Sequence, residues 1–318
     1  MSDPLFAPEG LPELSTALRP LEAWTDTPPP APSWAHEAAA RRPERQRIRV
    51  RGAEIEILSW GRRGDPGLLL AHGARAHADW WSLLAPALAA GRRVTAVSWS
   101  GMGGSDWRDA YDLDLYTEEA MAAAESGGLF EGQVPPVFLG HSFGGYVMVR
   151  LARRHGARLR RVITLDAGLA AFRHPPIPGP VRTYASRAEA MARFRLEPPQ
   201  AAWPYMAYWF ADHGLRRLGP DEASSDTSGG ASGRWTWRFD PDVFAKMGEV
   251  SIWDDIPEAD CPMVFIRCEK SDVATRETED RLRGWAPPDS RLLTIPAASH
   301  HPMAEDPLGL IDVLSPLC

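Results

Sequence analysis

The segment Gly140-His141-Ser142-Phe143-Gly144-Gly145 directly follows a short apolar run, Val137-Phe138-Leu139. This pattern predicts a strand that ends in a sharp G-x-S-x-G turn and opens a helix. Glycines are needed on both sides of the serine because a Cβ there would clash with the neighbouring strand and helix. The turn holds the serine hydroxyl out of the sheet, within reach of a base. Ser142 is therefore a candidate nucleophile.

Five further apolar runs share the character of the run before Ser142: they are short and continuously apolar. Strands buried on both faces of a parallel sheet have this composition. Helix-like stretches, such as Trp80–Ala90 and Tyr146–Arg154, lie between the runs. The alternation predicts an α/β fold with a doubly wound, mostly parallel sheet. The five runs are Leu68–Leu70, Val94–Val97, Val162–Leu165, Met263–Ile266 and Leu292–Ile295.

Two segments depart from this alternation. The first 45 residues are rich in proline and predict an extended arm that wraps the surface or stays mobile. Residues 169–240 combine prolines, an aromatic cluster and the Ser/Gly-rich stretch Ser224–Gly233. They are too long for a loop in a compact domain, so we expect an inserted lid with its own helices and one flexible connection. The expected parts are an arm (1–45), the core (46–168), the lid (169–240) and the rest of the core (241–318).

A half-buried antiparallel pair of strands is predicted at the start of the core. Arg47–Val50 and Glu54–Ile57 alternate apolar and polar residues, and Gly52-Ala53 supplies the turn between them.

The overall charge excludes several classes of protein. The 318 residues carry a formal net charge of −7, and no basic stripe indicates nucleic-acid binding. The basic run Arg41–Arg45 is interrupted by a proline and an acid, and we expect a solvated face there. A secretory signal and an apolar run of roughly 20 residues are both missing, so we expect a cytoplasmic protein with no membrane partner. The expected partner is a small-molecule substrate, and a homodimer is left open.

The cysteines indicate neither disulfides nor a structural metal. There are three of them, Cys261, Cys268 and Cys318, and none forms a C-x-x-C pair. An odd number without a repeated spacing argues against a disulfide framework, and we expect no metal and no cofactor.

A nucleophilic serine needs a base, and the base needs an orienting acid. His300 and His301 follow the last apolar run and are the candidate bases. Asp272 follows the run Met263–Ile266 and is the preferred acid, because the order Ser, Asp, His is typical of this arrangement. The rivals for the acid are Glu269, nearer the strand end, and Asp166, which ends the run after the elbow helix.

The expected oxyanion donors are two backbone N–H groups. Phe143 follows the nucleophile, and Ala74 lies in the loop Ala71-His72-Gly73-Ala74-Arg75 after the first buried strand. Gly73 permits a tight turn there. We expect His72 to be a structural hydrogen-bonding residue rather than a catalyst.

Together these motifs resemble the α/β-hydrolase superfamily, in its branch of lidded serine esterases and carbon–carbon hydrolases, over about residues 46–318. The matching pieces are His72-Gly73, Ser100-Gly101-Met102-Gly103-Gly104-Ser105, Gly140–Gly145, Ser271-Asp272, and His300 with Glu305 and Pro307. In the family's final motif the histidine lies five residues before an acid and seven before a proline, which favours His300 over His301. The resemblance implies Ser142 as nucleophile, His300 as base, Asp272 as acid, and Ala74 and Phe143 as oxyanion donors.

Two departures from the family pattern stand out. Family members often carry an aspartate where this chain has Ser98, and some lipases carry a Gly-Gly-Gly run in the oxyanion loop. Haloalkane dehalogenases and epoxide hydrolases of this fold place an aspartate at the elbow. A serine there forms an acyl-enzyme, so the resemblance implies a substrate with an acyl carbon.

The aromatic residues of the expected lid suggest an apolar substrate. The candidate substrate-binding residues are Arg75, Trp80, Trp203, Tyr208 and Trp209. The leading hypothesis is a serine hydrolase of a small to medium apolar ester. The alternatives are a lactonase, a carbon–carbon bond hydrolase in which Arg75 or Arg173 holds a carboxylate, and a non-catalytic ligand receptor on the same fold.

Overall fold

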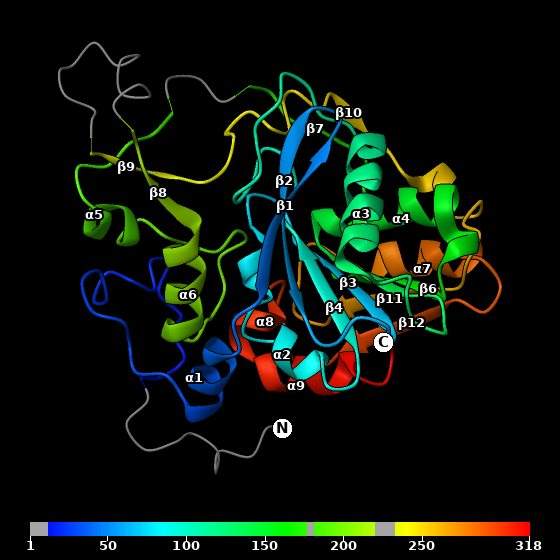
Figure 1. The fold of residues 1–318 in the computed structure, drawn as a ribbon, viewed down its shortest axis with the longest axis horizontal. Helices are drawn as coiled ribbons and strands as arrows, with labels where there is room; N and C mark the ends of the chain where they lie inside the picture. The colour runs from blue at the N-terminus through cyan, green and yellow to red at the C-terminus, as the bar shows by residue number, and fades with distance from the viewer. Residues whose placement is uncertain (1–11, 177–180, 220–232) are drawn as a thin grey trace.

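The computed structural model describes residues 12–176, 181–219 and 233–318 (Figure 1). An eight-stranded sheet has the order β1-β2-β4-β3-β5-β6-β11-β12. The pairs β1/β2 and β2/β4 are antiparallel, whereas all the other neighbours are parallel. The strands are β1 (Glu44–Val50), β2 (Ala53–Trp60), β3 (Gly67–Ala71), β4 (Arg93–Val97), β5 (Val137–His141), β6 (Arg161–Leu165), β11 (Met263–Cys268) and β12 (Arg291–Ile295). The predicted doubly wound, mostly parallel sheet is confirmed.

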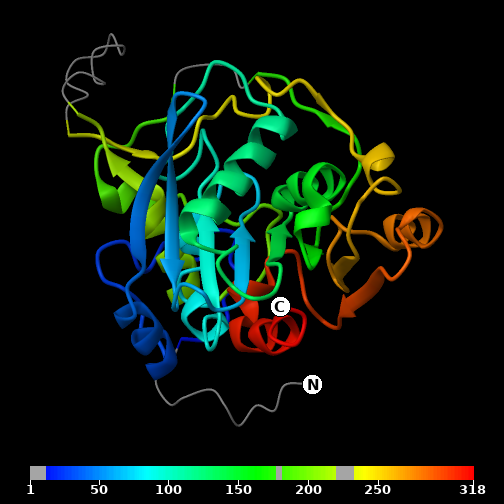
Figure 2. The ribbon, with the colours of Figure 1, turned by 45° about the vertical axis from the view of Figure 1, so that its right-hand side comes forward.

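Helices cover both faces of this sheet, as the two views in Figures 1 and 2 show. Side chains alternate along a strand, so Leu69 enters one hydrophobic core while Leu68 and Leu70 enter the other. The first core is closed by α3, α4 and α7, and the second by α2, α8 and α9. Their bounds are α2 (Ala85–Leu88), α3 (Leu113–Gly127), α4 (Phe143–His155), α7 (Arg276–Trp285), α8 (Pro302–Glu305) and α9 (Pro307–Leu314). Short 3-10 turns η3 (Gly156–Arg158) and η5 (Trp253–Asp255) also occur.

The helix expected over Trp80–Ala90 is wrong in its extent. The structure has a 3-10 turn, η2 (Ala78–Trp80), followed after a gap by the single-turn helix α2. The Ser82 hydroxyl donates to the Asp79 carbonyl at 2.8 Å, and the Leu84 N–H donates to the Trp81 carbonyl at 2.9 Å. These local bonds close shorter turns than an α-helix does.

The described part of the arm packs against the rest of the molecule. Ser15 and Ala202 exchange both backbone hydrogen bonds at 2.9 Å, and Leu21 is fully buried. The helix α1 (Ser33–Ala40) follows, and β1 then begins at Glu44. Residues 12–45 therefore wrap the surface, one of the two behaviours expected for the arm.

Residues 169–240, which we call the insertion, leave the sheet after β6. Within its described residues lie α5 (Arg187–Met191), α6 (Pro204–Gly214), β8 (Leu215–Arg217), β9 (Trp235–Trp237) and β7 (Phe172–Arg173), the last paired with β10 (Glu249–Val250). The Ser/Gly-rich stretch, apart from Gly233, lies outside the described residues. Across the described ranges, no helix combines the length and apolarity that a bilayer crossing requires.

Glu119 of α3 is a buried carboxyl that holds the turn after β4. It accepts the Ser100 N–H at 2.9 Å and a bond from Arg108 at 3.1 Å. Burial raises the pKa of Glu119 from 4.5 to about 7. The folded protein therefore binds more protons than the unfolded chain between these two pH values, and stability falls as pH rises through that window.

We expect Glu119→Gln to flatten this part of the stability curve. The parent protein should lose at most about 1.4 kcal/mol of unfolding free energy per pH unit from this group. Urea denaturation at several pH values between the two pKa values measures the slope. Glu118→Gln is the matched control, because Glu118 is only partly buried and pairs with Arg51 on the surface. Equal slopes for the parent and Glu119→Gln would contradict the assignment.

Candidate active site

Ser142 occupies a strained turn between β5 and α4. Its φ and ψ are 53° and −120°, a conformation that residues with a side chain rarely adopt. A Cβ on Gly140 would lie 2.3 Å from the Gly144 carbonyl oxygen, and one on Gly144 would lie 2.7 Å from the His72 carbonyl oxygen. The glycines of the motif thus allow strand, turn and helix to approach closely. The serine itself is partly exposed.

His300 lies in the loop after β12 with its side chain beside Ser142. Its Nε2 is 2.9 Å from the Ser142 Oγ, and its Nδ1 is 2.7 Å from the Asp166 Oδ2. An ionised carboxylate only accepts hydrogen bonds, so Nδ1 carries the proton and Nε2 accepts from the serine hydroxyl. The His300 side chain is 4% exposed. Its orientation suits a base that takes a proton from Ser142.

Asp166 follows β6 directly and is fully buried. Its backbone has a positive φ of 48°, which turns the chain sharply at the strand end. Besides His300, the carboxylate accepts the Cys268 N–H at 2.7 Å and the Ser271 hydroxyl at 2.5 Å. These donors offset the cost of burying the charge and hold the carboxylate in one orientation.

The prediction of Asp272 as the partner of His300 is wrong. Asp272 is exposed, and it has no hydrogen bond with His300 within the described part of the chain. β6 and β11 are parallel neighbours, so carboxylates after either strand reach the same sheet edge. The neighbour of Asp272, Ser271, donates to Asp166 instead. The rival Glu269 accepts the Ala297 N–H at 2.8 Å and so supports the loop before His300.

The loop after β3 approaches the nucleophile closely. A Cβ on Gly73 would lie 2.9 Å from the Ser142 Cβ. His72 holds this loop: its Nδ1 donates to the Gly73 carbonyl at 2.7 Å and its Nε2 accepts the Trp99 N–H at 3.1 Å. Burial lowers the pKa of His72 to about 3, so the ring stays neutral. These bonds fix the loop at Gly73, next to Ser142, and the following residue, Ala74, is exposed.

The N–H of Phe143 is the first of helix α4. The first N–H groups of a helix have no acceptor within it. An N–H of this kind, next to the nucleophile and at the positive end of a helix dipole, suits an oxyanion.

Glu56 is a buried carboxylate hydrogen-bonded to Ser98, and sequence reasoning missed it. The Glu56 Oε2 on β2 accepts the Ser98 hydroxyl at 3.0 Å and the Gly104 N–H at 2.9 Å. Although burial opposes it, the charges of Arg238 and Arg45 hold the pKa of Glu56 below its usual value. Glu56, on the strand next to β4, thus places a carboxylate beside Ser98. The alternation in β2 gave no signal for this role.

Two buried imidazoles, those of His141 and His301, lie beside the ring of His300. The His141 Nε2 donates to the His300 carbonyl at 2.8 Å, and the His301 Nε2 donates to the Glu197 carbonyl at 3.0 Å. Burial lowers the pKa of both well below the usual value, so both stay neutral. Ring nitrogens of the three histidines lie within 4.8 Å of one another, a spacing that could hold a metal ion. Because both nitrogens of His300 already bond Ser142 and Asp166, an ion would have to displace the base.

Gln200 of the insertion is hydrogen-bonded to the backbone of His301, the residue after His300. The Gln200 Oε1 accepts the His301 N–H at 2.7 Å, and the Gln200 Nε2 donates to the His301 carbonyl at 3.1 Å. Sequence reasoning missed both His141 and Gln200. The place of His141 inside the elbow motif was a usable signal, whereas nothing in the pattern around Gln200 indicates its contact.

The aromatic residues expected in the substrate site divide into two groups. Trp80 stacks on Phe210 at 4.2 Å between ring centroids and lies 5.4 Å from His301, close to the base. Three others use their polar atoms to hold the insertion. Trp203 donates to the Glu305 carbonyl, Tyr208 accepts from Arg187, and Trp209 donates to Ser82.

Arg75 belongs to the loop after β3 and contacts two residues of the insertion. Its guanidinium lies 5.8 Å from the centre of the Phe239 ring, and its NH1 is 3.5 Å from the Glu197 Oε2. Its Nε is buried and has no hydrogen-bond partner among the described residues.

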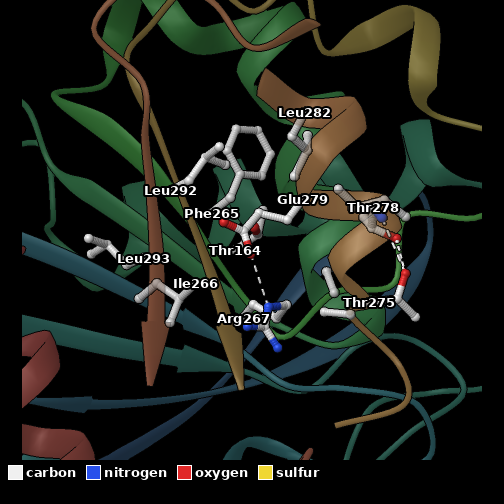
Figure 3. A pocket seen from close by; sticks show the side chains of 13 residues that line it. Thr164, Phe265, Ile266, Arg267, Thr275, Thr278, Glu279, Leu282, Leu292 and Leu293 are labelled. Carbon is white, nitrogen blue, oxygen red and sulfur yellow. Dashed lines mark hydrogen bonds and ion pairs between the residues drawn. The ribbon is translucent and has the colours of Figure 1, made fainter. Parts of the chain in front are cut away.

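Figure 3 shows a small cavity between α7 and the strands β6, β11 and β12. Its volume is about 20 Å³, which is room for about one water molecule. Arg267 and Glu279 form an ion pair beside it at 3.1 Å. The cavity is too small for a substrate.

Comparison with known proteins gives a consistent result. Residues 68–313 match the family described as the alpha/beta hydrolase family. A 2-hydroxymuconate semialdehyde hydrolase from a Pseudomonas species is 32% identical over 94 residues, which are 29% of this chain and 32% of that protein. Epoxide hydrolase A of Mycobacterium tuberculosis is 28% identical over 149 residues, covering 46% of this chain and 44% of that protein. The chain therefore spans less than half the length of these relatives.

A solved structure extends the likeness over almost the whole chain. An esterase of M. tuberculosis superposes with a TM-score of 0.67 at 19% identity, covering 93% of this chain and 97% of that one. At this identity the likeness concerns the fold.

Proposed function

We propose that this chain, which belongs to the alpha/beta hydrolase family, is a serine hydrolase that cleaves an ester or a related acyl bond. Ser142 is the proposed nucleophile, His300 the base and Asp166 the orienting acid. The observation that carries the proposal is the continuous line of hydrogen bonds from the Ser142 Oγ through both nitrogens of His300 to Asp166.

The geometry supports a two-step acyl transfer. Ser142 attacks the acyl carbon while the Nε2 of His300 takes its proton, and Asp166 stabilises the imidazolium that forms. The N–H groups of Ala74 and Phe143 are the proposed donors to the tetrahedral oxyanion. His300 then protonates the leaving group, and a water molecule hydrolyses the acyl-enzyme by the reverse proton transfers.

Apolar rings near the base favour a small to medium apolar substrate. Trp80 and Phe210 stack beside His301, and Phe239 lies under Arg75. The elbow of this chain carries a serine. A serine favours acyl substrates over epoxides.

Labelling with a fluorophosphonate tests the nucleophile. The parent protein should be labelled at Ser142 and should hydrolyse members of a p-nitrophenyl ester series, whereas Ser142→Ala should do neither. A folded parent that reacts with neither reagent would favour the ligand-receptor alternative. Labelling without turnover of any ester in the series would exclude the simple esterase.

A carbon–carbon bond hydrolase is the second candidate, and Arg75 favours it. Arg75 belongs to the loop that approaches Ser142 at Gly73. The Nε of its guanidinium is buried and has no hydrogen-bond partner among the described residues. It could hold a substrate carboxylate, as cleavage of an acidic ketone would need. Turnover of a vinylogous keto acid that is lost in Arg75→Gln, with p-nitrophenyl ester turnover retained, would identify this activity.

We expect Gln200→Leu to lower kcat by about 10- to 100-fold, because His301 would lose both bonds that fix the backbone next to the base. KM should change little, since the Gln200 amide bonds the backbone of Ala201 and His301 and no candidate substrate-binding residue. Steady-state ester kinetics measure the two constants. Gln133→Leu is the matched control, because Gln133 is exposed. Equal kcat values for the two variants would contradict the role of Gln200.

A further inference from the structure

A second cavity, of about 470 Å³, lies away from Ser142 between the arm and helix α6 of the insertion. Figure 1 shows α1 next to α6, and Trp34 of α1 meets Tyr205 of α6 edge to face at 6.1 Å. The volume lies within the range of small-molecule sites. The cavity is lined by Ala38, Ala39, Arg41, Arg42, Pro43, Arg45, Asp79, Ser82, Trp209 and His213.

The charges around this cavity are unbalanced. Arg45 is neutralised by Asp79 at 2.8 Å and by Glu56 at 2.6 Å. Arg41 and Arg42 also line the cavity, and neither has a carboxylate partner in the part of the chain that the structure describes. The solvated face expected for this basic run is therefore also one wall of a cavity. Two unpaired guanidinium groups on one wall attract an anion.

The opposite wall is held in place before any ligand binds. The Trp209 indole N–H donates to the Ser82 hydroxyl at 2.8 Å and to the Asp79 carbonyl at 3.1 Å. The Nδ1 of His213 donates to the Trp209 carbonyl at 2.9 Å, and the two rings lie 4.3 Å apart. The Nε2 of His213 has no hydrogen bond to the described residues, so it can make a further polar contact. A preformed wall lowers the entropy cost of binding.

We propose that this cavity binds a small polyanion that carries phosphate or carboxylate groups. Arg41 and Arg42 pair with its anionic groups, and Trp209 and His213 form the facing wall. The cavity exceeds the size of a single phosphate ion, so the ligand is a metabolite-sized molecule. The site does not involve Ser142, His300 or Asp166, and its test is independent of the proposed acyl transfer.

Isothermal titration of the full chain with inorganic pyrophosphate and, separately, with tricarballylate tests the proposal. We expect saturable one-to-one binding of at least one probe, with a Kd below about 1 mM. The Kd should rise as salt is added, because salt screens the attraction between charges. Tighter binding of pyrophosphate would identify a phosphate ligand, and tighter binding of tricarballylate a polycarboxylate. Failure of both probes to saturate would overturn the proposal.

The variant R41A/R42A should weaken binding by about 10-fold or more. The control R276A/R291A removes the same charge from exposed positions that do not line the cavity. Melting curves without ligand check that both variants are folded, and the single change Arg42→Gln repeats the test if the double variant is not. An equal loss of affinity in R41A/R42A and R276A/R291A would indicate non-specific attraction and overturn the site.

Discussion

Asp166→Asn is expected to lower kcat for ester hydrolysis about ten-thousand-fold. The Nδ1 of His300 donates to Asp166 at 2.7 Å, so the carboxylate fixes the tautomer in which Nε2 can accept the serine proton. An asparagine amide can offer a donor to Nδ1 and so favours the wrong tautomer. Steady-state kinetics on an ester that the parent hydrolyses measure the loss.

Asp272→Asn is the matched control for this experiment. Asp272 is exposed, lies four residues after the end of β11, and has no bond to His300 among the described residues. We expect kcat within about twofold of the parent, as for surface changes away from a site. Loss of activity in Asp272→Asn with retention in Asp166→Asn would reverse the assignment of the acid.

Gly140→Ala is expected to lower the free energy of unfolding by more than about 3 kcal/mol. The added Cβ would lie 2.3 Å from the Gly144 carbonyl oxygen and 2.6 Å from the Met148 Cγ. The first neighbour is backbone of the elbow helix, so the overlap cannot be relieved by turning a side chain. Urea denaturation measures the loss, and reduced soluble yield should accompany it.

Gly284→Ala is the matched control, and we expect it not to lower the free energy of unfolding. Gly284 lies in α7, and an added Cβ there would meet no atom within 4 Å. Alanine favours a helix interior over glycine by about 1 kcal/mol, so this variant should be unchanged or more stable. If Gly140→Ala unfolded at the same urea concentration as the parent, the close packing of strand and helix at the elbow would be refuted.

Most of the sheet was predictable because a strand that is buried on both faces has a continuously apolar sequence. Each of the six apolar runs became a parallel strand or, in β4, a strand with one antiparallel neighbour. The helix expected over Trp80–Ala90 failed because local hydrogen bonds of Ser82 and Leu84 close tighter turns there. The apolar content of a segment does not show whether local hydrogen bonds of this kind will compete with an α-helix.

The candidate site was predictable in its nucleophile position and in its histidine, but not in its acid. Asp166 and Asp272 follow two adjacent parallel strands, and sequence spacing places both at the same edge. The choice depends on the backbone turn at Asp166, whose positive φ aims the carboxylate at His300. It also depends on donors from Cys268 and Ser271, which are more than a hundred residues away. Such long-range contacts leave no local pattern.

The hydrogen bonds of Gln200 bear on how this protein could be re-engineered. Gln200 belongs to the insertion, yet its amide bonds both backbone groups of His301 beside the base. A chimaera that received the insertion of a relative would therefore exchange part of the support for His300, the proposed base. We expect a graft that keeps a glutamine at this position to retain more activity than one that does not.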